Sequence, residues 1–100
     1  MLNIKKTSEN GVACYKLEGR LDTVTAPELE AALQEGIAGI TALTLDLEKL
    51  EYISSAGLRV LLYAHKRMSG KGSVKVTHVN ETVMEIFEVT GFSDILDIEQ

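Results

Sequence analysis

The 100-residue chain contains one cysteine, one proline, five aromatic residues and no tryptophan. Because Cys14 is alone, it cannot form an internal disulfide, and its apolar neighbours predict a buried thiol on a strand. With one cysteine and two histidines far apart in sequence, we expect no transition-metal site made by the protein alone. The scarcity of aromatic residues predicts a core built from leucine, valine and isoleucine.

The chain also lacks a long apolar run and an excess of positive charge. No apolar run approaches the roughly 20 residues that span a bilayer, and residues 1–6 lack the apolar core of a secretory signal. We therefore expect a cytoplasmic protein without a membrane partner. The formal net charge of −5 argues against direct nucleic-acid binding, which depends on Lys and Arg, and fits a basic protein partner better. The length suits one domain.

The first 21 residues predict an antiparallel hairpin. Leu2–Lys6 and Val12–Leu21 alternate apolar and polar residues as strands do, and Ser8–Gly11 between them is rich in turn-forming residues. On the second strand, Lys16, Glu18 and Arg20 make the face opposite the apolar one polar. We therefore expect this strand to have one face in the core and one wetter face.

The residues after the hairpin predict helices that alternate with strands. Thr25 and Glu28 match a capping box at the start of a helix, which we expect to end between Gly36 and Ile40. Ala42–Leu47 then alternates as a strand. Similar patterns predict a helix after the serines at 54 and 55, a strand over 74–78, a helix capped by Asn80 and ended by Gly91, and a short strand over 95–98. This order is typical of an α/β fold with a mostly parallel sheet.

Two adjacent serines stand where a strand-like run meets an amphipathic helix. Ser54 and Ser55 lie at this junction, where a hydroxyl oxygen can accept a hydrogen bond from the free amides of the first turn. The same amides and the helix dipole favour an anion, so the fold would tolerate a phosphate on one of these hydroxyls. The residues alone leave both interpretations open, simple capping and phosphorylation.

Loops at the carboxyl ends of parallel strands gather along one edge of the sheet. We therefore expect the loops over 21–26, 48–55 and 78–81 to be neighbours in space. Asp22, Thr23 and Asp46 are then candidate companions of the two serines.

The patterns of common enzymes are incomplete around these serines. A serine-hydrolase elbow would need a first glycine that this stretch lacks, and His65 lies some 15 Å along the helix axis from Ser55. Residues 70–73 precede a strand rather than a helix, which makes them a turn and not a P-loop. The carboxylates of the loop-like segments fit solvated surface better than acid–base catalysis. We therefore predict no enzyme activity and no cofactor.

The run Ser54-Ser55-Ala56-Gly57-Leu58 resembles the Asp-Ser-x-Gly-Leu signature of STAS domains of the bacterial anti-sigma factor antagonist family. The agreement extends to Gly19–Asp22, Leu43–Leu47 and Val89–Phe92, so the resemblance covers residues 1–100 as a single STAS domain. One departure is Ser54, where the signature has Asp. The resemblance implies the STAS fold, a mixed and mostly parallel sheet with an N-terminal hairpin and about three helices.

The resemblance also implies a function. Members of the family bind an anti-sigma factor and so release a sigma factor; the anti-sigma factor is often a serine kinase that phosphorylates the antagonist, and a PP2C-type phosphatase reverses this. Ser55 matches the phosphorylated serine. The alternative is a STAS subunit of a lipid-transport or stressosome-like complex that acts without phosphorylation. The residues expected to bind the partner are Asp22, Thr23, Ser54, Ser55, Ala56, Gly57, Leu58 and Arg59.

Two of these residues carry more specific expectations. Gly57 falls in the first turn of a helix, where glycine is unfavourable by up to about 1 kcal/mol against alanine. We therefore expect it to leave room for the partner beside Ser55, and expect Gly57→Ala to keep or raise the melting temperature while weakening partner binding. Arg59 is large where many members of the family have a smaller residue, which would bias partner choice.

Overall fold

The structure is a computed structural model that describes residues 2–99. Its elements follow one another as β1 (Leu2–Glu9), β2 (Val12–Leu21), α1 (Ala26–Gly36), β3 (Ala42–Ile53), α2 (Ser55–Met68), β4 (Ser73–Thr77), α3 (Glu81–Thr90), the 3₁₀ helix η1 (Phe92–Asp94) and β5 (Asp97–Glu99). The predicted α/β fold with an N-terminal hairpin and three α-helices is confirmed. The short helix η1 was not predicted, and the last strand begins two residues later than expected.

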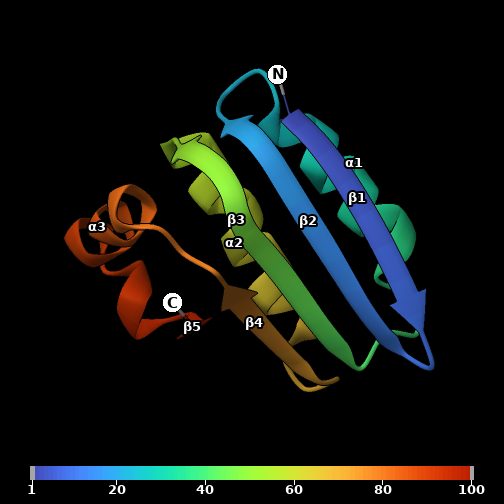
Figure 1. Cartoon of the computed structure of the whole chain (residues 1–100). Coiled ribbons are helices and arrows are strands. Elements are labelled where there is room, and N and C mark those ends of the chain that lie inside the picture. The colour runs from blue at the N-terminus through green and yellow to red at the C-terminus, as the bar shows by residue number, and fades with distance from the viewer. Residues whose placement is uncertain (1, 100) are drawn as a thin grey trace.

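The five strands form one sheet in the order β1-β2-β3-β4-β5. β1 pairs antiparallel with β2, whereas every later pair is parallel. Figure 1 shows α1 and α2 behind one face of the sheet and α3 beside the upper part of β3, beyond the end of the shorter β4. No helix of residues 2–99 covers the opposite face, which we call the open face.

Leucine and valine side chains dominate the core between the sheet and its helices, as predicted. The fully buried residues include Leu17, Leu45 and Leu61. The aromatic residues among them are Tyr15 and Phe87. Cys14 points the other way from this core, because neighbouring residues of a strand face opposite sides. Its thiol is therefore half-buried on the open face, so the predicted strand position is confirmed and the predicted burial is wrong. Burial, and then the nearby Asp46 carboxylate, raise the pKa of this thiol.

The hairpin and most helix ends follow the predicted local chemistry. Asn10 and Gly11 have positive φ values of 51° and 81°, as the two central residues of a type I′ turn require. The Asn80 side chain accepts a hydrogen bond from the amide of Val83 at 2.8 Å and so caps α3. Gly91 ends that helix in the left-handed conformation, with φ 83°.

The capping box predicted at Thr25 is wrong. Thr25 precedes α1, but its side chain makes no capping bond to the helix. Its hydroxyl instead donates to the carbonyl of Arg20 at 2.8 Å and accepts from the amide of Asp22 at 2.9 Å. Because these two bonds occupy the hydroxyl of Thr25, it does not cap α1. Thr25 instead holds the loop between β2 and α1 against the end of β2.

β3 is twice as long as the predicted strand, since it continues from Leu47 to Ile53. Its register against β2 shifts twice, each time with one extra residue on β3. These irregularities interrupt the alternation of side chains, as β-bulges do. Leu47, Leu50 and Ile53 are all buried although they are three residues apart. The predicted loop over 48–55 is therefore wrong, and the strand carries the chain up to Ser54.

Candidate functional site

The ends of β2 and β3 meet beside the start of α2. Leu21 lies opposite Ile53 in the parallel register, and the amide of Ser54 donates to the carbonyl of Leu21 at 2.9 Å. This hydrogen bond brings the loop over 21–26 next to the two serines. The predicted proximity of these two segments is confirmed.

Ser54 and Ser55 have different places at this junction. Ser54 has extended backbone angles, and its hydroxyl accepts a hydrogen bond from the amide of Gly57 at 3.4 Å, which makes it the N-cap of α2. Ser55 is the first residue of the helix, and its side chain is exposed. The capping role therefore belongs to Ser54, while the hydroxyl of Ser55 is accessible from solvent.

The start of α2 is favourable for an added negative charge. α1 and α3 carry Glu28 and Glu81 in their first turns, but α2 has no acidic residue there. Its last turn is basic, with His65, Lys66 and Arg67, which complements the helix dipole. The positive end of the dipole at Ser55 is thus left without a carboxylate on its own helix.

Asp22 organises the loop beside the serines. One of its carboxylate oxygens accepts hydrogen bonds from the amides of Val24 at 3.0 Å and Thr25 at 3.1 Å. The bond from Thr25 is the main reason that the pKa of Asp22 lies below its ordinary value, and Arg20 adds a weaker attraction at 3.9 Å. Asp22 is therefore ionised at neutral pH and holds the loop in shape.

Arg20 and Tyr52 lie on the open face, near the loop that Asp22 organises. The sequence did not indicate that they form a pair. They lie opposite each other in the β2–β3 register, and the guanidinium carbon of Arg20 is 4.6 Å from the centre of the Tyr52 ring. This distance fits a cation–π contact. The signal that would have revealed the pair is the shifted strand register, which sequence patterns do not show.

A shallow groove runs from the loop after β2 to the outer side of α2. The exposed residues Thr23 and Arg59 lie at this groove, as does Ala56, which follows Ser55. The groove is also lined by Ala26, Pro27 and Glu30 of α1 and by Val60 of α2. Three of the predicted partner-binding residues thus share one concave surface beside Ser55.

Gly57 and Leu58 do not belong to that surface. Both are buried, and a Cβ on Gly57 would lie 2.7 Å from Cγ of Leu21 and 2.8 Å from Cγ1 of Ile53. Gly57 therefore gives room to the protein's own core, and the prediction that it makes room for a partner is wrong. Leu58 is 5% exposed and packs in the same core.

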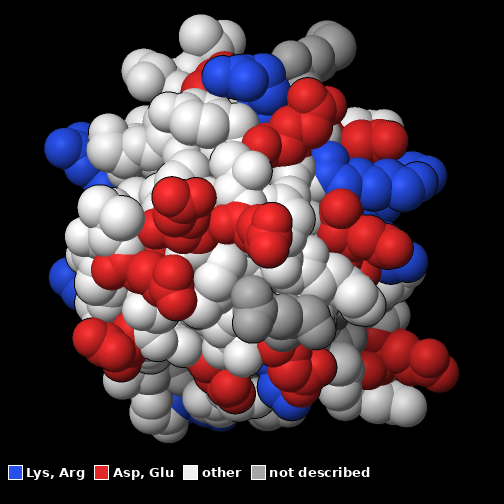
Figure 2. Space-filling model, turned by 60° about the vertical axis from the view of Figure 1, so that its left-hand side comes forward, with Lys and Arg blue, Asp and Glu red and all other residues white. Residues whose placement is uncertain are grey.

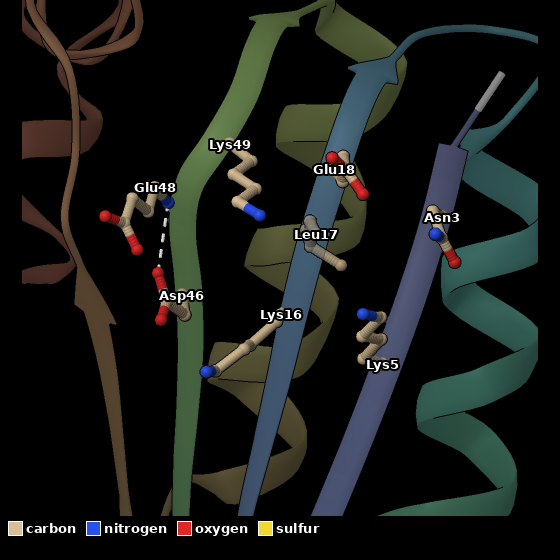
Figure 3. Close-up of a pocket in the computed structure, with 8 residues that line it drawn as sticks. All are labelled: Asn3, Lys5, Lys16, Leu17, Glu18, Asp46, Glu48 and Lys49. Carbon is tan, nitrogen blue, oxygen red and sulfur yellow. Dashed lines mark hydrogen bonds between the residues drawn. The ribbon is translucent and has the colours of Figure 1, made fainter.

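Asp46 also lies away from the serines. It is nine residues before Ser55 on β3, roughly 25 to 30 Å at the rise of a strand, and Figure 3 shows it on the open face with Lys16 and Glu48. The His78 loop lies beside this part of β3, because β4 ends at Thr77 opposite Asp46. The predicted placement of Asp46 beside Ser55 is therefore wrong. The predicted contact between the loop over 78–81 and residues 48–55 is confirmed, because the Asn80 amide donates to the carbonyl of Leu50 at 2.7 Å.

Asp46, Glu48 and His78 form a separate cluster of potential metal ligands, which the sequence did not suggest. One ligand atom from each lies within 4.8 Å of the others. One oxygen of Asp46 already accepts from the amide of Glu48 at 3.0 Å and lies 3.1 Å from Nδ1 of His78. Since these contacts account for the arrangement, we assign no metal to the cluster.

Positive and negative charges are distributed unevenly along the chain. All ten Lys and Arg residues lie in residues 1–75, so the remaining quarter of the chain carries only acidic charge. Figure 2 shows carboxylates spread over the side of the molecule that carries α3. The exposed acidic residues there are Glu81, Glu85, Glu88, Asp94, Asp97 and Glu99. This surface would repel a nucleic-acid backbone. Within residues 2–99, the helices are too short or too polar to cross a bilayer.

Comparison with known proteins decides the family. The family model for the STAS domain matches residues 3–100. The chain belongs to the STAS domain family. A putative anti-sigma factor antagonist of Bordetella bronchiseptica, BtrV, is 37% identical over 89 residues, which are 87% of this STAS domain and 75% of the relative. The anti-sigma-B factor antagonist of Listeria monocytogenes is 34% identical, over 98% of this chain and 87% of the relative.

Solved structures show the same fold. An anti-sigma factor antagonist from Mycobacterium paratuberculosis superimposes with a TM-score of 0.90 at 24% identity, over 99% of this STAS domain and 86% of that chain. The Bacillus cell fate determinant SpoIIAA in its phosphorylated form superimposes with a TM-score of 0.76 at 16% identity, over 98% and 92% of the two chains. The predicted STAS fold and family are thereby confirmed.

Proposed function

We propose that this STAS domain is an anti-sigma factor antagonist, which binds an anti-sigma factor and so releases a sigma factor. It is then a regulatory binding protein and not an enzyme, and it acts in the cytoplasm with the transcription machinery. Two relatives that bear this name align with most of the chain. The main structural support for the proposed site is that Ser55 is exposed and begins α2 directly after the capping serine.

We further propose that phosphorylation of Ser55 turns binding off. A phosphate adds about −1.5 to −2 charges, which the free protein accepts at the amino end of α2 because the dipole and the first-turn amides offset part of the cost. In the complex the same group would be desolvated beside the ionised Asp22. Like charges that meet at an interface cost several kcal/mol. Affinity therefore falls while the fold is retained.

The proposed partners follow from this switch. The anti-sigma factor is of the serine-kinase type and phosphorylates Ser55, and a phosphatase of the PP2C type removes the phosphate. The binding surface comprises the start of α2 and the loop after β2. Its residues are Asp22, Thr23, Ser55, Ala56 and Arg59, with Ser54 as the cap that fixes the helix; Gly57 and Leu58 are excluded because they are buried.

Two experiments test the proposal. Mass spectrometry of the chain after treatment with its cognate kinase should place the phosphate on Ser55; phosphate on Ser54 with Ser55 unmodified would overturn the assignment. Capture from native cytoplasm should retain an anti-sigma factor on the wild-type chain and lose it on Ser55→Asp, with Ser55→Ala as the matched control that keeps it. Capture of transporter subunits, equally by all three proteins, would support the lipid-transport alternative instead.

A further inference from the structure

Arg59 lies one helical turn after Ser55, and its guanidinium has no partner in the part of the chain that the structure describes. Arg20 contacts Asp22 and Tyr52, and Arg67 contacts a tyrosine ring. Arg59 makes no ion pair and no ring contact within residues 2–99, and its side chain is exposed. It is thus free to bind a new anion nearby.

Helix geometry directs Arg59 toward Ser55. Residues four apart on a helix lie on the same face with about 5–6 Å between their Cβ atoms. Each Cα–Cβ bond leans toward the amino end, so a long side chain covers the turn before its own. The guanidinium of Arg59 can therefore reach back over the side chain of Ser55, at the edge of the groove that Thr23 and Ala56 also line.

We propose that Arg59 binds the phosphate of phosphorylated Ser55 within the same helix. This inference rests on the proposed function, since it requires a phosphate on Ser55. A guanidinium donates two parallel hydrogen bonds to phosphate oxygens, a geometry that a lysine ammonium cannot match. The phosphate would lie between the first-turn amides of α2 on one side and Arg59 on the other.

This contact changes the surface in two ways. The start of α2 gains a negative group, and Arg59 ceases to be a free cation for the partner. The charged groups that face the phosphate are then Arg59 on its own helix, Asp22 in the loop after β2 and Glu30 on α1, which shares the groove. Since α2 has no acidic residue in its first turn, no carboxylate of that turn competes for the guanidinium.

The test uses protein that carries phosphoserine at position 55 through co-translational incorporation, so neither the kinase nor the partner is needed. The ³¹P resonance is followed between pH 5 and 8, where the phosphate loses its second proton at about pH 6 and becomes a dianion. A bound guanidinium favours the dianion, so Arg59→Gln should raise the midpoint of this titration by about 0.2–0.4 pH unit. Arg59→Lys keeps the charge but cannot donate two parallel hydrogen bonds, so its midpoint should lie between those of wild type and Arg59→Gln.

Arg67→Gln is the matched control, because Arg67 lies in the last turn of α2 and should leave the midpoint unchanged. A second readout needs no variant: phosphorylation should shift the Nε–H resonance of Arg59 and not that of Arg67. Midpoints within about 0.1 pH unit for wild type and Arg59→Gln, or an unmoved Arg59 resonance, would overturn the contact. Circular dichroism establishes that each protein is folded.

The results separate this inference from the proposed function. If the titration shows the contact but phosphorylated protein still binds the anti-sigma factor, the switch fails and the role of Arg59 stands. If the midpoints coincide while phosphorylation abolishes binding, the switch stands and the role of Arg59 fails.

Discussion

Replacement of Gly57 by alanine tests how α2 packs against the ends of β2 and β3. The new Cβ would lie 2.7 Å from Cγ of Leu21 and 2.8 Å from Cγ1 of Ile53, whereas carbon atoms pack best at about 3.5–4.0 Å. Both neighbours are buried, at 0% and 1% exposure, so they have little room to move. Overpacking of this kind costs about 1–3 kcal/mol, and the better helix propensity of alanine offsets up to about 1 kcal/mol. We expect a net loss of about 1–2 kcal/mol.

Thermal unfolding followed by circular dichroism measures this loss. In a domain of this size, 1 kcal/mol corresponds to about 4–8 °C in melting temperature, so Gly57→Ala should melt about 4–16 °C below wild type. Ser55→Ala, an exposed substitution in the same helical turn, is the control and should stay within about 0.5 kcal/mol of wild type. An unchanged or higher melting temperature for Gly57→Ala would refute the argument that close packing of the helix requires glycine here.

Three further substitutions test local contacts. Ser54→Ala should lower the free energy of unfolding by about 1 kcal/mol through loss of the α2 cap, and equal stability by urea titration would contradict that role. Asn80→Ala should cost more, about 2 kcal/mol, because the Asn80 amide also donates to the carbonyl of Leu50 at 2.7 Å; a smaller loss than for Ser54→Ala would count against this. The carboxylate of Asp22 has a pKa lowered from 3.8, so it stabilises the fold above about pH 4 and loses this effect as the pH falls through the lowered value. The stability advantage of wild type over Asp22→Asn should thus be constant from about pH 7 to 5 and shrink below about pH 4; a constant difference down to about pH 2 would refute it.

The order and type of the elements could be predicted because each rests on local chemistry. The turn before Val12 contains Asn10-Gly11, which tolerate positive φ at both central positions. Asn80 and Gly91 mark the two ends of α3 by a side-chain cap and a left-handed residue. In each case the structure is determined by residues within one turn of the chain.

The length of β3 could not be predicted, because the strand's irregular register depends on its neighbour. The sequence alternates to Leu47, and the spacing of three to Leu50 and then Ile53 fits no simple strand. Only pairing with β2 shows that extra residues on β3 restore the buried face. The wrong prediction that Asp46 lies near Ser55 has the same cause. The half of β3 that was not predicted separates the two residues.

The local roles of the two serines could be predicted from the sequence, but the packing of the residues around them could not. Their position between a strand and a helix identified a cap, and the structure assigns that role to Ser54. The depth at which α2 sits on the sheet is a tertiary property, so the sequence could not show that Gly57 faces Leu21. For the same reason it could not show that the loop after β2 takes the hydroxyl of Thr25.

The central claim is that a phosphate on Ser55 lowers affinity for the anti-sigma factor without unfolding the domain. The most direct measurement is a calorimetric titration of the cognate anti-sigma factor with unmodified and Ser55-phosphorylated protein, with far-UV circular dichroism of both. We predict that phosphorylation weakens binding by about a hundredfold or more, from several kcal/mol of like-charge repulsion, while the spectra coincide. Dissociation constants within about threefold of each other, or a phosphorylated protein that has lost its fold, would contradict the claim.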